Sequence, residues 1–82
     1  MEKKAFLDID DLYCAAFLVL NRIQPKLVPG FGNHITFRFP RTGQVLSLVA
    51  TFSAENPPVG VRDFAGAIRN LRALMIARKS QA

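Results

Sequence analysis

The chain has few residues that support covalent or metal chemistry: one cysteine, one histidine and no tryptophan in 82 residues. The single cysteine, Cys14, excludes an intrachain disulfide and a cysteine-rich metal site. The longest apolar run, residues 12–20, has nine residues, whereas a helix that crosses a bilayer needs about 20. Aspartates in residues 8–11 lie where a secretory signal would need apolar residues. We therefore expect a cytoplasmic protein with no membrane association.

Length and composition favour one small folded domain. Half of the residues, 50%, are apolar, which excludes an intrinsically disordered chain. A domain of this mass removes only about 60% of its unfolded surface from water, so a second copy can help to complete the core. We expect a single domain over residues 1–82, with residues 1–7 and 80–82 frayed.

Positive charge dominates the body of the chain. Lys and Arg total 11 against 6 Asp and Glu, a formal net charge of +5. Residues 12–82 carry nine basic residues against only Glu55 and Asp63. Such a body attracts polyanions: nucleic acid, an anionic membrane or an acidic partner. The alternative interpretation is that the charge serves solubility alone.

The apolar run at residues 12–20 predicts the first helix. Asp8 or Asp10 would cap its start, because a carboxylate accepts hydrogen bonds from the free N–H groups of the first turn. Asn21 and Arg22 would end it. The run is apolar on all sides, which is typical of a helix buried on most faces. In so small a domain this indicates self-association, and we expect a homo-oligomer.

Two strands and two further helices complete the expected fold. Residues 23–28 and 34–39 form a hairpin around a turn rich in glycine and proline. The second strand alternates strictly, with an inward face of Ile35, Phe37 and Phe39. The helices cover residues 43–54, capped by Thr42, and residues 61–79. The apolar stripe of the helix over residues 43–54 consists of Val45, Leu48, Val49 and Phe52. The stripe of the helix over residues 61–79 consists of Phe64, Ile68, Leu71 and Met75, and Val61, Ala67 and Leu74 flank it. The fold class is thus α+β: a helix, a two-stranded antiparallel hairpin, then two helices.

Three stretches together carry a family resemblance. They are residues 11–18 (DLYCAAFL), residues 36–39 (TFRF) and residues 64–74 (FAGAIRNLRAL), of which the last is the most specific. With them, the chain resembles a family of small bacterial proteins of unknown function over nearly its whole length. The resemblance implies a small stand-alone α+β domain and carries no activity.

The residues suited to catalysis do not form a recognisable set. Asp8, Asp10 and Asp11 gather at the expected helix start, where capping and the helix dipole explain them better than a metal or acid–base site. Cys14 lies in the apolar helix and His34 opens a strand, and no motif pairs them as nucleophile and base. We expect no enzyme, no metal, no cofactor and no small-molecule substrate.

Two surfaces carry candidate nucleic-acid-binding residues. The first is the outward face of the second strand, with His34, Thr36 and Arg38, followed by Arg41. A two-stranded ribbon fits the major groove, where arginine can reach guanine. The second is an arc of the last helix opposite Leu71, with Arg62, Arg69, Arg72 and Lys79. Ile76 lies in the same arc and fits a protein partner better than a phosphate backbone.

Two functions remain open at this point. The order of strand 34–39, helix 43–54 and helix 61–79 is that of a ribbon-helix-helix repressor, although residues 57–58 are both proline and residues 23–28 compete for the strand's edge. A helix-turn-helix fits less well, because its turn has about three or four residues. The favoured function is a non-enzymatic interaction module that self-associates. The alternative is a nucleic-acid-binding protein that uses the basic strand and helix face.

Overall fold

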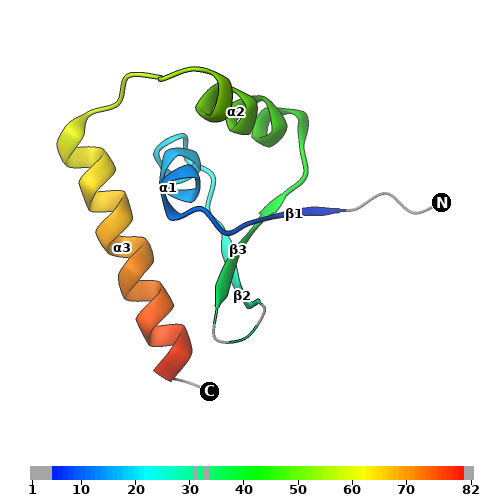
Figure 1. The fold of residues 1–82 in the computed structure, drawn as a ribbon, viewed down its shortest axis with the longest axis vertical. Helices are drawn as coiled ribbons and strands as arrows, with labels where there is room; N and C mark the ends of the chain where they lie inside the picture. The colour runs from blue at the N-terminus through cyan, green and yellow to red at the C-terminus, as the bar shows by residue number, and fades with distance from the viewer. Residues whose placement is uncertain (1–4, 31, 33, 81–82) are drawn as a thin grey trace.

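The structure is a computed structural model that describes residues 5–30, 32 and 34–80. Within these residues the chain forms three strands and three helices (Figure 1). Their order is β1 (Phe6–Ile9), α1 (Leu12–Leu20), β2 (Lys26–Pro29), β3 (Ile35–Pro40), α2 (Gly43–Ala54) and α3 (Val61–Ser80). The expected α+β class is confirmed.

The strands form one antiparallel sheet in the order β1-β3-β2. The expected hairpin is therefore present as β2 and β3, and β1 adds a strand on the other edge of β3. Phe6 and Leu7, which the sequence placed in a frayed segment, instead pair with Pro40 and Phe39. At the other end, Ser80 is the last residue of α3. Residues 1–4 and 81–82, also expected to fray, lie outside the described residues.

The inward face of β3 is the centre of the core. Phe37 and Phe39 are 1% and 0% exposed, and they lie opposite Ile9 and Leu7 of β1 in the ladder. Leu27 of β2 pairs with Phe37 from the other side. The period-two alternation assigned this face correctly, because successive strand residues point to opposite sides of a sheet.

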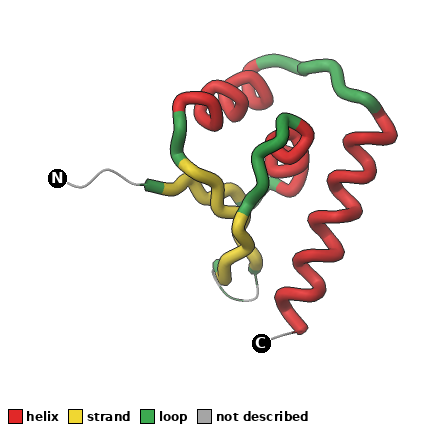
Figure 2. Tube along the Cα trace, turned by 180° about the vertical axis from the view of Figure 1, so that it is seen from behind, coloured by secondary structure: helices red, strands yellow, loops and turns green. Residues whose placement is uncertain are grey.

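Helix α1 is buried by elements of its own chain. Cys14, Ala15, Ala16, Phe17 and Leu18 are all buried, and α1 contacts α2, α3 and β1. Figure 2 shows α1 enclosed between α3 on one side and α2 and the strands on the other. The all-round apolar pattern was interpreted correctly as burial, but a second copy is not needed to cover this helix.

The three aspartates before α1 have separate roles. Asp11, rather than Asp8 or Asp10, is the N-cap: its Oδ1 accepts hydrogen bonds from the N–H groups of Tyr13 at 2.8 Å and Cys14 at 3.3 Å. Asp8 and Asp10 instead bind side chains of β3, as described below. The helix therefore begins later than expected, because the two earlier aspartates belong to the sheet.

The start of α2 agrees with the sequence, and the apolar face of α3 agrees in part. Thr42 caps α2 by accepting from the N–H of Val45 at 3.1 Å. In α3, Leu71 is 2% exposed and Ala67 is buried. Val61 and Leu74, expected at the border of the core, are 82% and 48% exposed. The helix thus touches the rest of the chain along a narrower stripe than its pattern predicts.

Helix α1 ends in a Schellman motif with an unusual residue at its left-handed position. Arg22 has φ of 67°, and its N–H donates to the carbonyl of Val19 at 2.9 Å. The N–H of Ile23 donates to the carbonyl of Leu18 at 3.1 Å. Glycine is the usual residue here, because a Cβ crowds the following carbonyl in the left-handed region.

We expect Arg22→Gly to stabilise the domain by about 0.5–1 kcal/mol, because relief of the left-handed strain exceeds the extra backbone entropy of glycine. Urea unfolding followed by circular dichroism measures the change. Arg22→Ala is the matched control, since it removes the same side chain and retains the Cβ. Equal stabilities of the two variants would contradict this account of α1's end.

Candidate nucleic-acid interface

The outward face of β3 lies beside acidic residues. Thr36 is 8% exposed, and its hydroxyl donates to Oδ1 of Asp10 at 2.9 Å. His34 precedes the strand and is exposed. The hydroxyl of Thr36 is therefore occupied by Asp10 and does not face solvent as a base-contacting group.

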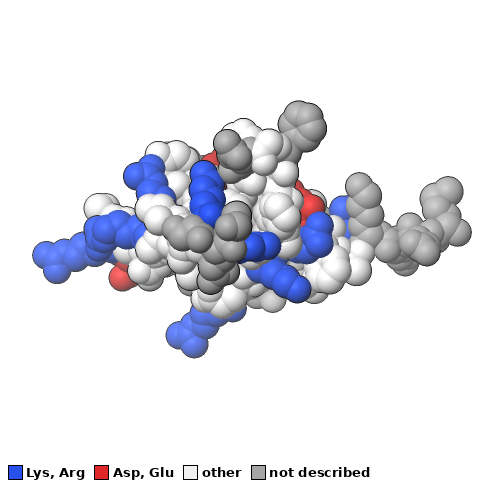
Figure 3. All heavy atoms as spheres, turned by 90° about the horizontal axis from the view of Figure 1, so that it is seen from below, with Lys and Arg blue, Asp and Glu red and all other residues white. Residues whose placement is uncertain are grey.

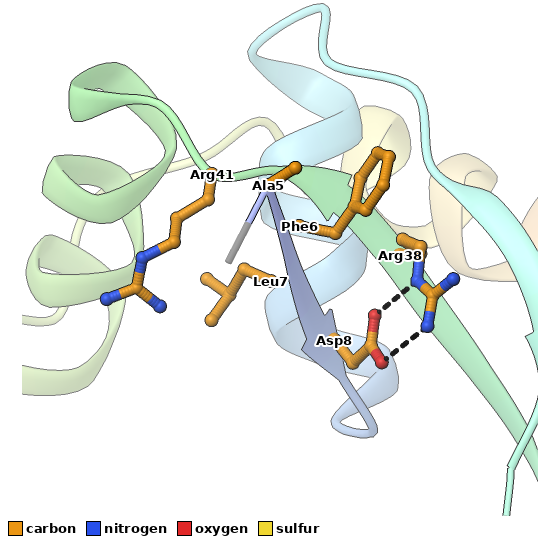
Figure 4. Close-up of a pocket in the computed structure, with 6 residues that line it drawn as sticks. All are labelled: Ala5, Phe6, Leu7, Asp8, Arg38 and Arg41. Carbon is orange, nitrogen blue, oxygen red and sulfur yellow. Dashed lines mark hydrogen bonds and ion pairs between the residues drawn. The ribbon is translucent and has the colours of Figure 1, made fainter. Parts of the chain in front are cut away.

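Arg38 forms a two-pronged salt bridge with Asp8. Its Nε lies 2.8 Å from Oδ1 and its Nη2 lies 3.1 Å from Oδ2 (Figure 4). The guanidinium also lies over the ring of Phe6, 5.4 Å from the ring centroid. The hydrogen bond to Asp8 raises the pKa of the Arg38 guanidinium. The strongest candidate on the strand is thus neutralised by a carboxylate from β1.

Arg41 lies at the same hollow as Arg38, but on the other side of β1. A hollow of about 450 Å³ wraps around β1, and its lining includes both arginines and Asp8. In Figure 4, Arg41 and Leu7 lie on one side of β1, while Phe6, Asp8 and Arg38 lie on the other. The Arg41 N–H donates to the carbonyl of Ala5 at 3.0 Å. Arg38 and Arg41 thus extend to different sides of β1, and their joint use in nucleic-acid binding stays a prediction.

The sheet topology also disagrees with a ribbon-helix-helix arrangement. That arrangement needs a strand that pairs with its copy in a second chain, whereas β3 is paired on both edges by β1 and β2. The similarity in element order did not include β1. The ribbon-helix-helix interpretation of residues 34–79 is wrong for this reason.

The basic residues of α3 have a different environment. Arg62, Arg69, Arg72 and Lys79 are all exposed, and they point away from the buried Leu71. Among the described residues, the one salt bridge joins Arg38 to Asp8, so these four side chains form no ion pair there. Seen from below in Figure 3, Lys and Arg side chains spread over the face while few Asp or Glu reach it. Ile76, 67% exposed, lies within the same arc.

Cys14, considered above as a nucleophile, is buried in α1. Burial raises the pKa of the Cys14 thiol, and the nearby charge of Asp11 raises it further. No group of three or more potential metal ligands occurs among the residues that the structure describes. In the same residues, no helix combines the length and apolar character that a membrane span requires.

Sequence reasoning missed one feature that the fold assembles. Tyr13, Phe17, Phe52 and Phe64 line a common hollow together with residues 55–57 and 59. Tyr13 and Phe17 are four residues apart on one helix, which placed them on one face. No local pattern indicated that Phe52 and Phe64 would join them, because that depends on how three helices pack.

Comparisons of the chain with family models, with curated proteins and with solved structures found no match. The resemblance to small bacterial proteins of unknown function therefore stays a prediction. The same holds for the cytoplasmic location and for the partners expected from the sequence.

Proposed function

We propose that this chain is a non-enzymatic binding module that holds nucleic acid on the outward face of α3. One observation carries the proposal: Arg62, Arg69, Arg72 and Lys79 are exposed on one side of a 20-residue helix and form no ion pair among the described residues. Such a helix is about 30 Å long. Its arginines can each form two parallel hydrogen bonds with a phosphate.

The contacts on β3 support a mode of binding that reads the backbone rather than the bases. Arg38 and Thr36, the residues suited to base edges, are held by Asp8 and Asp10. Phosphate contacts from α3 carry no sequence information by themselves. We therefore expect affinity for both duplex DNA and single-stranded RNA, with little preference between sequences.

The test is fluorescence anisotropy of labelled duplex DNA and single-stranded RNA at about 50 and 200 mM salt. Four phosphate contacts give a slope of about −3.6 in log K against log salt, so binding should weaken about 100-fold between these two conditions. Arg69→Ala combined with Arg72→Ala should reduce the slope by about 2.

The matched control is Arg22→Ala combined with Arg41→Ala, which removes the same charge from positions outside α3. Both of these residues are exposed. The control should keep most of the affinity and the slope. If both double variants lose affinity equally, the net charge alone attracts the polyanion, and the assignment to α3 fails.

Self-association is a second candidate, supported by exposed apolar residues on the same helix. Val61 is 82% exposed and Leu74 is 48% exposed, and exposed apolar patches are typical of protein interfaces. Since α1 is mostly covered within the chain, the exposed apolar residues of α3 are our candidate contact for a second copy. Light scattering on the samples used for anisotropy measures the mass, and a monomer at every concentration would exclude this candidate.

A further inference from the structure

Three helices meet around a hollow of about 390 Å³ that no basic residue lines. We call it the aromatic hollow. It lies at the start of α1, the end of α2 and the start of α3. Its walls include four of the eight aromatic residues in the chain, a concentration that gives the hollow a specific chemistry. They are Tyr13, Phe17, Phe52 and Phe64, with Val59 and Glu55 beside them.

The four rings form two pairs. Tyr13 and Phe64 have centroids 6.4 Å apart and ring planes 23° apart. Phe17 and Phe52 have centroids 5.8 Å apart and planes 37° apart. The face of an aromatic ring carries partial negative charge, so a cation with an apolar shell is attracted to such walls.

The charges around the aromatic hollow also favour a cation. Glu55 is its one charged lining residue and is also the C-cap of α2. The last turn of α2 contains no basic residue, so the partial negative charge of the helix C-terminus is not offset there. An adjoining hollow of about 350 Å³ shares Phe17 and Val59 and adds Asp63, again without Lys or Arg in its lining.

The charge around the aromatic hollow contrasts with that of the chain as a whole. The net charge is +5, yet these two neighbouring hollows are lined by acids and no bases. A bare ammonium ion would lose strong hydration on entering an apolar wall. An ammonium ion whose hydrogens are replaced by methyl groups keeps its charge and presents apolar atoms to the rings.

We propose that the aromatic hollow binds an alkylated ammonium group, with its methyl groups against the four rings and its charge near Glu55. The same chemistry occurs in a free quaternary amine such as choline and in a trimethylated lysine side chain. This site is independent of the nucleic-acid face on α3, since none of the four basic residues proposed there lines it.

The chain offers a built-in probe of this site. Tyr13 is the one tyrosine and there is no tryptophan, so tyrosine fluorescence reports directly on the aromatic hollow. Titration with tetramethylammonium or choline should change it saturably, with a Kd of the order of 1 mM. The neutral control is 3,3-dimethylbutan-1-ol, the carbon analogue of choline, which should bind at least about tenfold more weakly.

Variants separate the charge from the rings, with choline binding followed by NMR. Tyr13→Leu should weaken binding about fivefold while Tyr13→Phe keeps it, because only leucine removes the ring face. Glu55→Gln should weaken binding about threefold. Phe6→Leu is the matched control, since Phe6 is 54% exposed and lies on the sheet, and it should change nothing.

The outcomes decide both the proposal and the source of the cation. Tighter binding of a trimethyllysine peptide than of choline supports a protein ligand, and the reverse supports a free amine. Equal affinity for choline and its neutral analogue would overturn the proposal, because the hollow would then be merely apolar. The proposal would also be overturned if tetramethylammonium, choline and the trimethyllysine peptide all failed to bind saturably.

Discussion

A chain that starts at Asp10 is expected to lose its cooperative fold, because β1 is structural. Removing residues 1–9 takes Leu7 and Ile9 away from the core, and each buried aliphatic side chain contributes about 1.5–3 kcal/mol. It also removes the ladder partners of β3 on the β1 side. The summed loss approaches the whole free energy of unfolding, which is about 5–10 kcal/mol for a domain of this length. Circular dichroism and the dispersion of the amide NMR spectrum measure the loss.

The matched control begins the chain at Ala5. It keeps β1 and the Ala5 carbonyl that accepts from the Arg41 N–H, so it should unfold at nearly the full-length midpoint. The shorter chain would also leave Arg38 without Asp8 and free one edge of β3, which favours aggregation. A well-folded, monomeric chain starting at Asp10 would mean that residues 6–9 are the frayed lead-in that the sequence predicted.

Local patterns explain what the sequence could predict. The helical spacing of Val45, Leu48, Val49 and Phe52 and the alternation through Ile35, Phe37 and Phe39 each depend on neighbours within a few residues. The cap at Thr42 is also a local interaction. These features identified α2, α3, the hairpin and the inward face of the sheet.

Strand β1 was not predicted, because the contacts that define it are with residues far away in the sequence. It has four residues, and the side chain of Asp8 is bound by Arg38, 30 positions later. Aspartates before an apolar run fit an N-cap, so the sequence favoured Asp8 or Asp10 for a role that Asp11 fills. Only pairing with β3 shows that the first two aspartates face its outward side chains.

The pairing of β1 with β3 also decides which of the predicted binding residues on β3 are available to a ligand. The alternation placed Arg38 and Thr36 outward correctly, but it could not show that acids from β1 lie opposite them. On α3 the outcome differs, because the helix lies at the edge of the molecule (Figure 1) and its basic residues form no ion pair within the described part of the chain. Sequence periodicity identifies which way a side chain points, while its availability depends on the fold.

The second large effect is expected from Phe37→Asp, which should leave the chain unfolded at 25 °C. Phe37 is 1% exposed and lies between Ile9 and Leu27 in the ladder. Losing a buried phenylalanine costs about 3–5 kcal/mol, and burying a carboxylate there adds several more. Together these are comparable with the whole stability of a small domain. Circular dichroism at 25 °C and a thermal melt are sufficient to measure the loss of folded structure.

Two controls make the result specific to the register of β3. Phe37→Leu keeps the site apolar and should remain folded, with a loss of about 1–2 kcal/mol. His34→Asp introduces the same acid at an exposed position and should be nearly neutral. The opposite pattern, with Phe37→Asp folded and His34→Asp unfolded, would mean that the strand faces the other way. A slip of one residue exchanges the two faces of a strand, so this pair of variants tests the position of every side chain on β3 at once.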